Sequence, residues 1–364
     1  MSVDPVDPRE ADASALLLLD HVAAAERAGH RRLRAAADHF HIPDDARIDD
    51  RTAAALDATM RATVAGVDAG IRDHAARLLG SRGEPALAQG LRTAGSPFDR
   101  VVRAGLFREP ALFGELYARV RMDALARALP VMVLPGNDGP TMVARLAQAS
   151  DRLVAAAAIA MLAAQARRGS VGEAVPGAVD LIRPHHARIA WWVAAALREM
   201  AGAGDRIAAL DAALAESVRR AVDAQGELVP LEVAAMRLAQ AVEPQGDEVP
   251  ALLAEAIGDG RLVLFAAIVA RASGLAFERV RDLVIDPDGA RLWVVLRALA
   301  VDRATIARIG FALAEAEPVR DVEGFADRID SIMEVTPAAA RVALAPMALD
   351  ADYHAAMLAL GLAQ

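Results

Sequence analysis

Two histidines close to the end of a predicted N-terminal helix come nearest to a metal-binding pattern. His39 and His41 stand two residues apart, with Asp44 and Asp45 just behind them. Side chains two apart on a helix point to different sides, so both imidazoles could bind one metal only if the helix ends between them. We interpret the group as an exposed helix end, where the negative pole favours His. No metal site is predicted.

A second histidine pair, His185 and His186, follows Pro184 in the first turn of another predicted helix. The positive helix pole disfavours a cationic His there, so we expect a capping or packing role. The GAGD stretch at 202–205 has some likeness to a phosphate loop, but it follows a helix. A phosphate loop needs a preceding strand, fuller glycine spacing and, for triphosphates, a Lys that this chain lacks. We interpret it as a helix connector.

Other catalytic patterns are missing from the sequence. It has no GxSxG elbow and no HExxH pair, and its carboxylates stand beside Arg at salt-bridging spacing or at helix starts, which solvated faces explain. Trp191 and Trp192 lie in an apolar run, where adjacent rings on a helix point about 100° apart. One ring is expected in the core and the other in a helix contact; an exposed second ring would mark an interface. No catalytic or cofactor-binding residue and no cofactor is predicted.

Composition favours a large helical protein without a nucleic-acid partner. The 364 residues are 55% hydrophobic but only 4% aromatic, and Ala supplies much of the apolar content, which favours close helix packing. All the positive charge is on Arg, and the net charge of -9 opposes sequence-independent attraction to nucleic acid. The absence of Cys excludes disulfides and thiolate chemistry and agrees with a cytoplasmic location.

No targeting or membrane-spanning segment is predicted. Residues 1–10 are acidic and contain Pro where a signal peptide needs basic and then apolar residues, so we expect a disordered lead-in. The longest apolar run, Leu153–Ala164, falls well short of the roughly 20 residues that cross a bilayer. It is interpreted as a buried helix.

The N-terminal region, residues 11–83, predicts an antiparallel helical hairpin. Each helix carries one apolar or small seam at alternating steps of three and four, and Gly80 ends the second. On that second helix the pairs Asp57/Arg61 and Asp68/Arg72 are expected on the outside. The first seam consists of Ala15, Leu18, Val22, Ala25, Gly29, Leu33, Ala36 and Phe40, and the second of Leu56, Met60, Val64, Val67, Ile71 and Leu78.

Such a hairpin cannot cover its own seams. One solution is a homodimer through residues 11–79, in which two hairpins complete a four-helix bundle. The alternative is a monomer in which the hairpin packs back on later helices of the same chain.

Shorter helices follow a Gly-rich stretch, Ser81–Ser96, which is the best candidate for a domain boundary. They include the predicted segments Thr141–Arg168 and Pro184–Met200. We predict an all-α fold with a HEAT-like helical array over residues 84–245 and a C-terminal helical domain over residues 246–364, although no fixed repeat period aligns.

The clearest helices lie between Val249 and Leu299. A stripe of Leu262, Phe265, Ile268 and Val269 predicts one helix, ended by Gly274 in a Schellman closure with Leu275 folding back. A second helix carries Phe277, Val280, Leu283 and Val284. Asp286-Pro287 is expected to begin a third, which holds Leu292, Val295, Leu296 and Leu299.

The arrangement GDGRLVLFAAIVARASGLAFERVRDLVIDPDGARLWVVLRAL closely resembles the C-terminal region of a bacterial family named domain of unknown function 2336. The resemblance covers mainly Val249–Glu317, and HRRLRAAADHFHIPDDARIDDRTAAAL is similar to the start of some members. It implies an all-helical protein, some relatives having helical repeats. It implies no activity and no functional residues.

Three function classes follow. The first is a non-enzymatic cytoplasmic scaffold whose helical surfaces bind an unidentified protein partner. The second is a signalling relay in which a dimeric N-terminal bundle presents His21 or His74 to a receiver-type partner. The third is an enzyme with a pocket assembled from distant residues, which missing motifs do not exclude.

Overall fold

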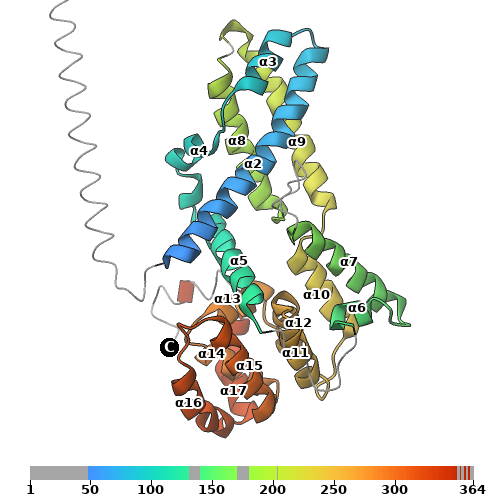
Figure 1. The fold of residues 1–364 in the computed structure, drawn as a ribbon, viewed down its shortest axis with the longest axis vertical. Coiled ribbons are helices and arrows are strands. Elements are labelled where there is room, and N and C mark those ends of the chain that lie inside the picture. Colours follow the sequence, from blue (N-terminus) through green and yellow to red (C-terminus); the bar gives the residue numbers. More distant parts are fainter. Residues whose placement is uncertain are drawn as a thin grey trace, which may run out of the picture. The chain divides into compact units, whose positions relative to one another are not determined.

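The computed structural model describes residues 48–130, 140–169, 180–202 and 204–350, together with residues 353, 356, 357 and 360. Every regular element in these ranges is a helix, which confirms the all-α prediction (Figure 1). The first helix of the predicted hairpin lies outside the described residues, as do the lead-in, His21 and the group His39, His41, Asp44 and Asp45.

The chain divides into two units, residues 1–53 and 54–364. In the first unit the described residues are 48–53, where the Asp49 carboxylate accepts the Thr52 N–H at 2.8 Å. This bond caps the start of α2 (Asp50–Ser81), because the first N–H groups of a helix have no intrahelical acceptor.

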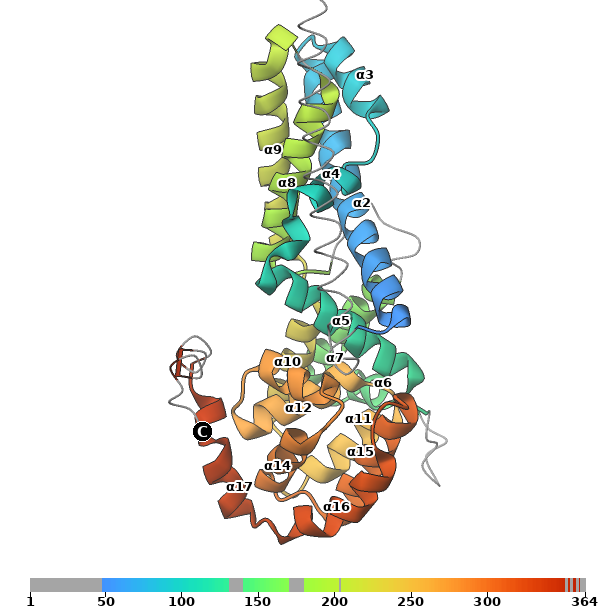
Figure 2. The same cartoon turned by 90° about the vertical axis from the view of Figure 1, so that its left-hand side faces the viewer.

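One apolar core of the second unit combines helices that are far apart in sequence. Its side chains come mainly from α2, α3 (Pro85–Thr93), α4 (Phe98–Ala104), the 3₁₀ turn η2 (Leu106–Arg108), α8 (Arg183–Ala201) and α9 (Ile207–Glu227). Helices α8 and α9 follow each other through a short connector and lie side by side, with α2 beside them (Figures 1 and 2). The predicted seam of α2 is therefore covered by helices of its own chain.

Most of that seam is buried as predicted, since Leu56, Val64, Val67 and Ile71 are all below 7% exposed. The outer pairs differ. Asp57 and Arg61 are exposed, but Arg72 and Asp68 are mostly buried. The prediction that this second pair lies outside was wrong, because the Arg72 guanidinium also donates to the carbonyls of Leu91, Ala94 and Gly95 at the end of α3.

The second core surrounds α12 (Leu262–Ser273). Its nine consecutive residues from Leu262 to Ala270 are buried, so the helix has no solvent face along this stretch, whereas the sequence predicted a single stripe. The helices that contribute to this core are α5 (Pro110–Ala128), α6 (Met142–Leu146), α7 (Arg152–Gly169), α10 (Leu231–Val242), α11 (Val249–Gly258), α13 (Phe277–Ile285), α14 (Ala290–Ala298), α15 (Arg303–Ala316), α16 (Val322–Glu334) and α17 (Pro337–Leu344).

Helix α5 belongs to both cores. Leu112 and Leu116 in its first half are buried in the α2–α8–α9 core, and Met122 and Leu125 in its second half are buried against the helices around α12. The stretch 81–96 also contains α3, whose buried Ala88 and Leu91 join the first core. The proposed division of the chain at this stretch stays a prediction.

Several local predictions need correction. The segment expected as one helix from Thr141 forms two, α6 and α7. Helix α14 begins at Ala290, after a Gly289 with φ of 69°, rather than at Pro287. Gly274 takes the left-handed conformation as expected, but its N–H bonds to the Ala270 carbonyl, which is the simpler αL closure and not the Schellman motif.

The run from Leu153 to Ala164 is helical but only half buried. Val154, Ala158, Met161 and Ala164 face the core, whereas Leu153 is 76% exposed and Ile159 is 56% exposed. The expectation of a buried helix was therefore wrong for its outer face. None of the helices within the described ranges has the length and apolar content needed to span a bilayer.

Candidate functional site

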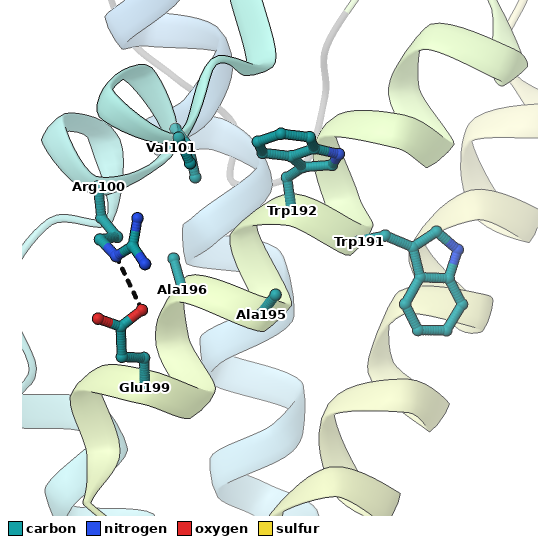
Figure 3. Close-up of a pocket in the computed structure, with 8 residues that line it drawn as sticks. Arg100, Val101, Trp191, Trp192, Ala195, Ala196 and Glu199 are labelled. Carbon is teal, nitrogen blue, oxygen red and sulfur yellow. Dashed lines mark hydrogen bonds and ion pairs between the residues drawn. The ribbon is translucent and has the colours of Figure 1, made fainter.

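A groove of about 450 Å³ lies between α4 and α8. Helix α8 supplies most of its wall, and α4 supplies the rest. Figure 3 shows the ring of Trp192 next to Val101 over the groove, whereas the ring of Trp191 points away from Val101 and Arg100. The lining residues are Arg100, Val101, Ala104, Trp191, Trp192, Ala195, Ala196 and Glu199.

Both tryptophans are exposed, Trp191 by 46% and Trp192 by 36%. The prediction that one ring enters the core was therefore wrong, and the alternative that an exposed ring marks an interface applies to both. The reason lies in the seam of α8, in which Ile189, Val193 and Leu197 recur every four residues and are fully buried. Positions 191 and 192 fall to the side of this seam, and the same spacing in the sequence could have placed them outside.

The two charged side chains that line the groove neutralise each other. Arg100 Nε lies 2.8 Å from Glu199 Oε2, and both side chains are about half exposed. An ion pair this exposed contributes little to stability, on the order of 0 to 1 kcal/mol. Its effect on binding is clearer, because it leaves a mainly carbon-lined groove with no unpaired charge to attract an ion.

His74, the relay candidate on α2, faces α9. Its Nδ1 lies 2.9 Å from the Ser217 hydroxyl, whose own proton is donated to the Ala213 carbonyl at 2.7 Å. A hydroxyl has one proton, so Ser217 must accept from His74 Nδ1–H, and His74 Nε2 keeps its lone pair. Burial and, after it, the nearby Arg220 cation lower the pKa of His74, which favours the neutral ring.

His186 lies in the first turn of α8 and is 1% exposed. Burial lowers its pKa to about 4, so the ring is neutral at physiological pH. This agrees with the packing role inferred from the sequence. Among the described residues of the expected connector, Gly202 ends α8 and the short turn Gly204–Arg206 leads into α9.

A buried ionic cluster joins α5, α7 and α10. Arg168 at the end of α7 is 8% exposed in its side chain, and it lies 2.5 Å from Glu232, 3.2 Å from Asp123 and 3.5 Å from Asp180. Arg119 pairs with Asp180 and also donates to its carbonyl. Solvated faces, the explanation inferred from the sequence, do not account for these carboxylates. No local pattern could reveal the cluster, because its members lie between positions 119 and 232.

The arginines set the charge state of this cluster. Burial alone would lower the pKa of Arg168, but the carboxylates of Glu232, Asp123 and Asp180 raise it above its ordinary value. Burial would likewise raise the pKa of Glu232, but Arg168 and Arg119 hold it below its ordinary value. Asp180 differs, because burial raises its pKa despite Arg119. Removal of one partner from a buried pair of this kind would leave an uncompensated charge, which is strongly destabilising.

No group of three or more His, Asp or Glu side chains within the described ranges could hold a metal ion. The sequence matches no family model, and the comparisons with curated proteins and with solved structures give no match.

Proposed function

We propose that this protein is a non-enzymatic interaction scaffold and that the α4–α8 groove binds an amphipathic helix of a protein partner. The observation that carries the proposal is the adjacent exposed pair Trp191 and Trp192 beside a groove of about 450 Å³. Tryptophan is enriched among the residues that dominate binding energy at interfaces, because a large ring buries much apolar area at low entropic cost.

The chemistry of the groove defines the partner. Val101, Ala104, Ala195 and Ala196 offer small apolar contacts, and the Arg100–Glu199 pair adds no net charge. An uncharged aliphatic or aromatic anchor fits this surface, whereas a charged side chain would lose its hydration without gaining a free counter-ion. The partner segment is therefore an apolar helix face, in the helix-in-groove mode.

The test measures binding of a purified partner to single variants of the full chain. Affinity capture from the native host supplies candidates, and titration calorimetry with each candidate measures its affinity. Trp192→Ala should weaken binding by about 30-fold or more, as expected for an interface residue worth at least about 2 kcal/mol. Val342→Ala removes an apolar side chain that is 75% exposed on α17 and should leave the affinity unchanged. Equal affinity of the Trp192 and Val342 variants would reject the groove.

Tryptophan fluorescence adds a direct readout. The chain has three Trp, and the third, Trp293, is buried at 6% exposure. Partner binding should shift the emission of wild type to shorter wavelength, and the Trp192→Phe variant should show a smaller shift. Light scattering on the same samples covers the case in which the occupant is a second copy. If wild type is a dimer and Trp192→Ala is a monomer, the groove binds a second copy of this chain and not a helix of another protein.

The homodimer through residues 11–79 belongs to the same proposal as a separate interface. The α2 seam is already covered by α8 and α9, which favours the alternative in which this helix packs on its own chain. A dimer would therefore use other faces of this region. Truncation at Glu84 would not test it cleanly, since it would remove α2 from the core. Light scattering on the full chain at tens of micromolar is the appropriate measurement.

The proposal has three further parts: a HEAT-like array, a cytoplasmic location and membership of the domain of unknown function 2336 family. The side-by-side pairs α8/α9 and α7/α10 support a helical array, and the absence of Cys supports a reducing compartment. The helices from α11 to α15 support the family assignment, because they carry the apolar and glycine positions on which the resemblance rests.

A histidine relay is the second candidate, favoured by one observation. Ser217 holds His74 by Nδ1 and leaves Nε2 with its lone pair, which a phosphoryl acceptor requires. Incubation of the full chain with a phosphorylated receiver domain should then label the protein, and His74→Ala should abolish labelling. His186→Ala, which changes a buried ring, is the matched control. Labelling that survives in His74→Ala would exclude this residue as the acceptor.

An enzyme is the third candidate, and it has the least support. The polar cavity next to the ionic cluster is lined by one carboxylate, Asp123. That carboxylate is already engaged by Arg168 at 3.2 Å, and among the described residues no second carboxylate or His lines the cavity to act with it.

A further inference from the structure

A second cavity, of about 380 Å³, lies among α5, α7 and the turn between α11 and α12. It is separate from the α4–α8 groove and has a different lining. Three cationic side chains, Arg127, Arg168 and Arg261, border it with one carboxylate and one amide. The full lining is Asp123, Ala126, Arg127, Met161, Gln165, Arg168, Leu231, Gly260, Arg261, Leu262 and Val263.

Three buried polar atoms on this cavity have no hydrogen-bond partner among the described residues: Gln165 Oε1, Arg168 Nη2 and Arg261 Nε. Of the three, Arg168 is the weakest case, although its side chain is only 8% exposed. Its Nη2 lies 3.2 Å from Asp123 Oδ1 as an ion pair, but without the geometry of a hydrogen bond. A buried donor or acceptor left unpaired costs about 1 to 3 kcal/mol, so Gln165 Oε1 on α7 and Arg261 Nε before α12 together indicate a polar occupant.

The start of α12 opens on the same cavity. Leu262 and Val263, its first two residues, line it, and no side chain caps this end of the 12-residue helix. The first N–H groups of a helix lack intrahelical acceptors and carry the positive end of the dipole, which favours an anion. Gly260, with φ of 65°, stands two residues before the helix and also lines the cavity.

The charges define which anion fits. Arg168 is neutralised by Asp123, Asp180 and Glu232, whereas no ion pair of Arg127 or Arg261 is found among the described residues. Two cations remain for the occupant, which matches the charge of a phosphate monoester at neutral pH better than that of a monocarboxylate. Gln165 Oε1 requires a donor, so the rest of the ligand carries an O–H or N–H group.

We propose that this cavity binds a small phosphate monoester. Its phosphate contacts Arg127, Arg261 and the N-terminus of α12, and a hydroxyl or amino group on its organic part donates to Gln165. The volume of about 380 Å³ lies within the range of small-molecule sites, roughly 300 to 1,000 Å³. The proposal rests on its own observations and does not depend on the α4–α8 groove.

Thermal unfolding of the full chain at constant ionic strength tests the site, with inorganic phosphate and glycerol phosphate as probes and sulfate and acetate as competing anions. A ligand that binds only the folded state raises Tm in proportion to the logarithm of its concentration above Kd. Glycerol phosphate should raise Tm at lower concentration than inorganic phosphate, because only the ester can reach Gln165. Acetate should have no effect, and sulfate a weaker one.

Single variants identify the cavity. Arg261→Gln and Arg127→Gln should each raise the Kd of glycerol phosphate by about tenfold or more, since each removes a charge-assisted contact. Arg308→Gln removes an exposed cation on α15, outside the cavity, and should leave the Kd unchanged. Gln165→Leu should weaken glycerol phosphate but not inorganic phosphate. Arg127 is itself exposed, so its variant reports on binding even if Arg261→Gln lowers stability.

Three results would overturn the proposal. One is no rise in Tm with either phosphate probe. Another is a rise in Tm that is equal for sulfate and phosphate and is also the same in Arg127→Gln and Arg308→Gln. That result would indicate general ionic stabilisation. The third is stabilisation by acetate alone, which would assign the cavity to carboxylates.

Discussion

Helices α12 and α8 lie in the two cores of the protein and differ in how completely the chain covers them. Along α12 every residue from Leu262 to Ala270 is buried. On α8 one face is buried, and both tryptophans remain exposed. A helix that is apolar all round must be covered all round, and it contributes to stability along its whole surface. A helix with one seam keeps its other faces for binding.

The origin of the neighbours differs as well. Helix α12 packs mainly against α10, α11, α13 and α14, which lie close to it in sequence, and it also packs against the distant α5. Helix α8 packs most closely against α9, which follows it in sequence, but it also shares its core with α4 and with α2, more than 100 positions earlier. We therefore expect substitutions on α12 to act mainly on stability and substitutions at the exposed edge of α8 to act mainly on binding.

The sharpest test compares an aromatic side chain from each helix. Phe265→Ala should lower the free energy of unfolding by about 3 to 5 kcal/mol, because the ring is fully buried on α12 and its loss leaves a cavity. Trp191→Ala should cost less than about 1 kcal/mol, since that ring is 46% exposed. Urea unfolding followed by circular dichroism measures both. Similar losses for the two variants would remove the distinction between the helices.

Two helical glycines extend the comparison between covered and open faces. A Cβ at Gly310 of α15 would lie 2.2 Å from the Phe325 ring of α16, whereas a Cβ at Gly114 of α5 would meet nothing within 4 Å. Helix propensity favours Ala over Gly by about 1 kcal/mol at either position. Gly114→Ala should therefore stabilise by up to that amount, but Gly310→Ala should destabilise by about 1 to 3 kcal/mol through overpacking.

Phe325 has little freedom to move away from Gly310. Its ring centroid lies 4.8 Å from that of Trp293 and 5.7 Å from that of Phe311. Thermal unfolding of both glycine variants gives the signs of the two effects. Stabilisation by Gly310→Ala would show that the aromatic group repacks at low cost, and that this part of the core is less tightly packed than the area around α12.

The buried face of α8 can be tested by pH. The pKa of His186 is about 4 in the folded protein, against about 6.5 in an unfolded chain. Below pH 6.5 His186 binds a proton in the unfolded chain, whereas in the folded protein it stays neutral down to about pH 4. The free energy of unfolding therefore falls as the pH falls through this window. Between pH 7.5 and pH 5 the loss from this group is about 2 kcal/mol.

Urea unfolding at the two pH values measures the loss, and variants separate it from the carboxylates. Between pH 7.5 and pH 5, His186→Leu should lose about 2 kcal/mol less of its free energy of unfolding than wild type. His185→Leu alters the neighbouring ring, which is partly exposed, and should keep the wild-type sensitivity. If His186→Leu shows the same loss as wild type, the inner face of α8 is wetter than its burial indicates.

Sequence periodicity predicted the helices because burial on one face leaves a spacing of three and four, and it located the most buried side chains of α12, α13 and α14. It could not show that α12 is covered on every side, since that depends on five neighbouring helices. The exposed position of Trp191 and Trp192 was within reach, because Ile189, Val193 and Leu197 already mark the buried seam. The ionic cluster of Arg168 could not be predicted from the sequence, because long-range contacts bring its carboxylates together.

The smallest expected effect concerns how the helices end, and it compares α2 with α14. Both close with Schellman bonds: the Glu84 N–H donates to the Leu79 carbonyl after α2, and the Val301 N–H donates to the Leu296 carbonyl after α14. The residue in the left-handed conformation is Gly83 in the first case, with φ of 80°, but Ala300 in the second, with φ of 58°. A Cβ makes this conformation unfavourable by about 1 to 2 kcal/mol.

Ala300→Gly should remove that strain, but glycine also gains freedom in the unfolded chain, which offsets about 0.5 to 1 kcal/mol. The net gain is therefore at most about 1 kcal/mol. Gly83→Ala is the reciprocal change, and a Cβ there would meet nothing within 4 Å, so its net loss of about 1 kcal/mol reports backbone strain and unfolded-chain entropy without a steric clash. If the denaturant midpoint rises in Ala300→Gly and falls in Gly83→Ala relative to wild type, both helix ends follow the same backbone preference. A loss of stability in Ala300→Gly would instead show that the Ala300 methyl group contributes packing that outweighs its strain.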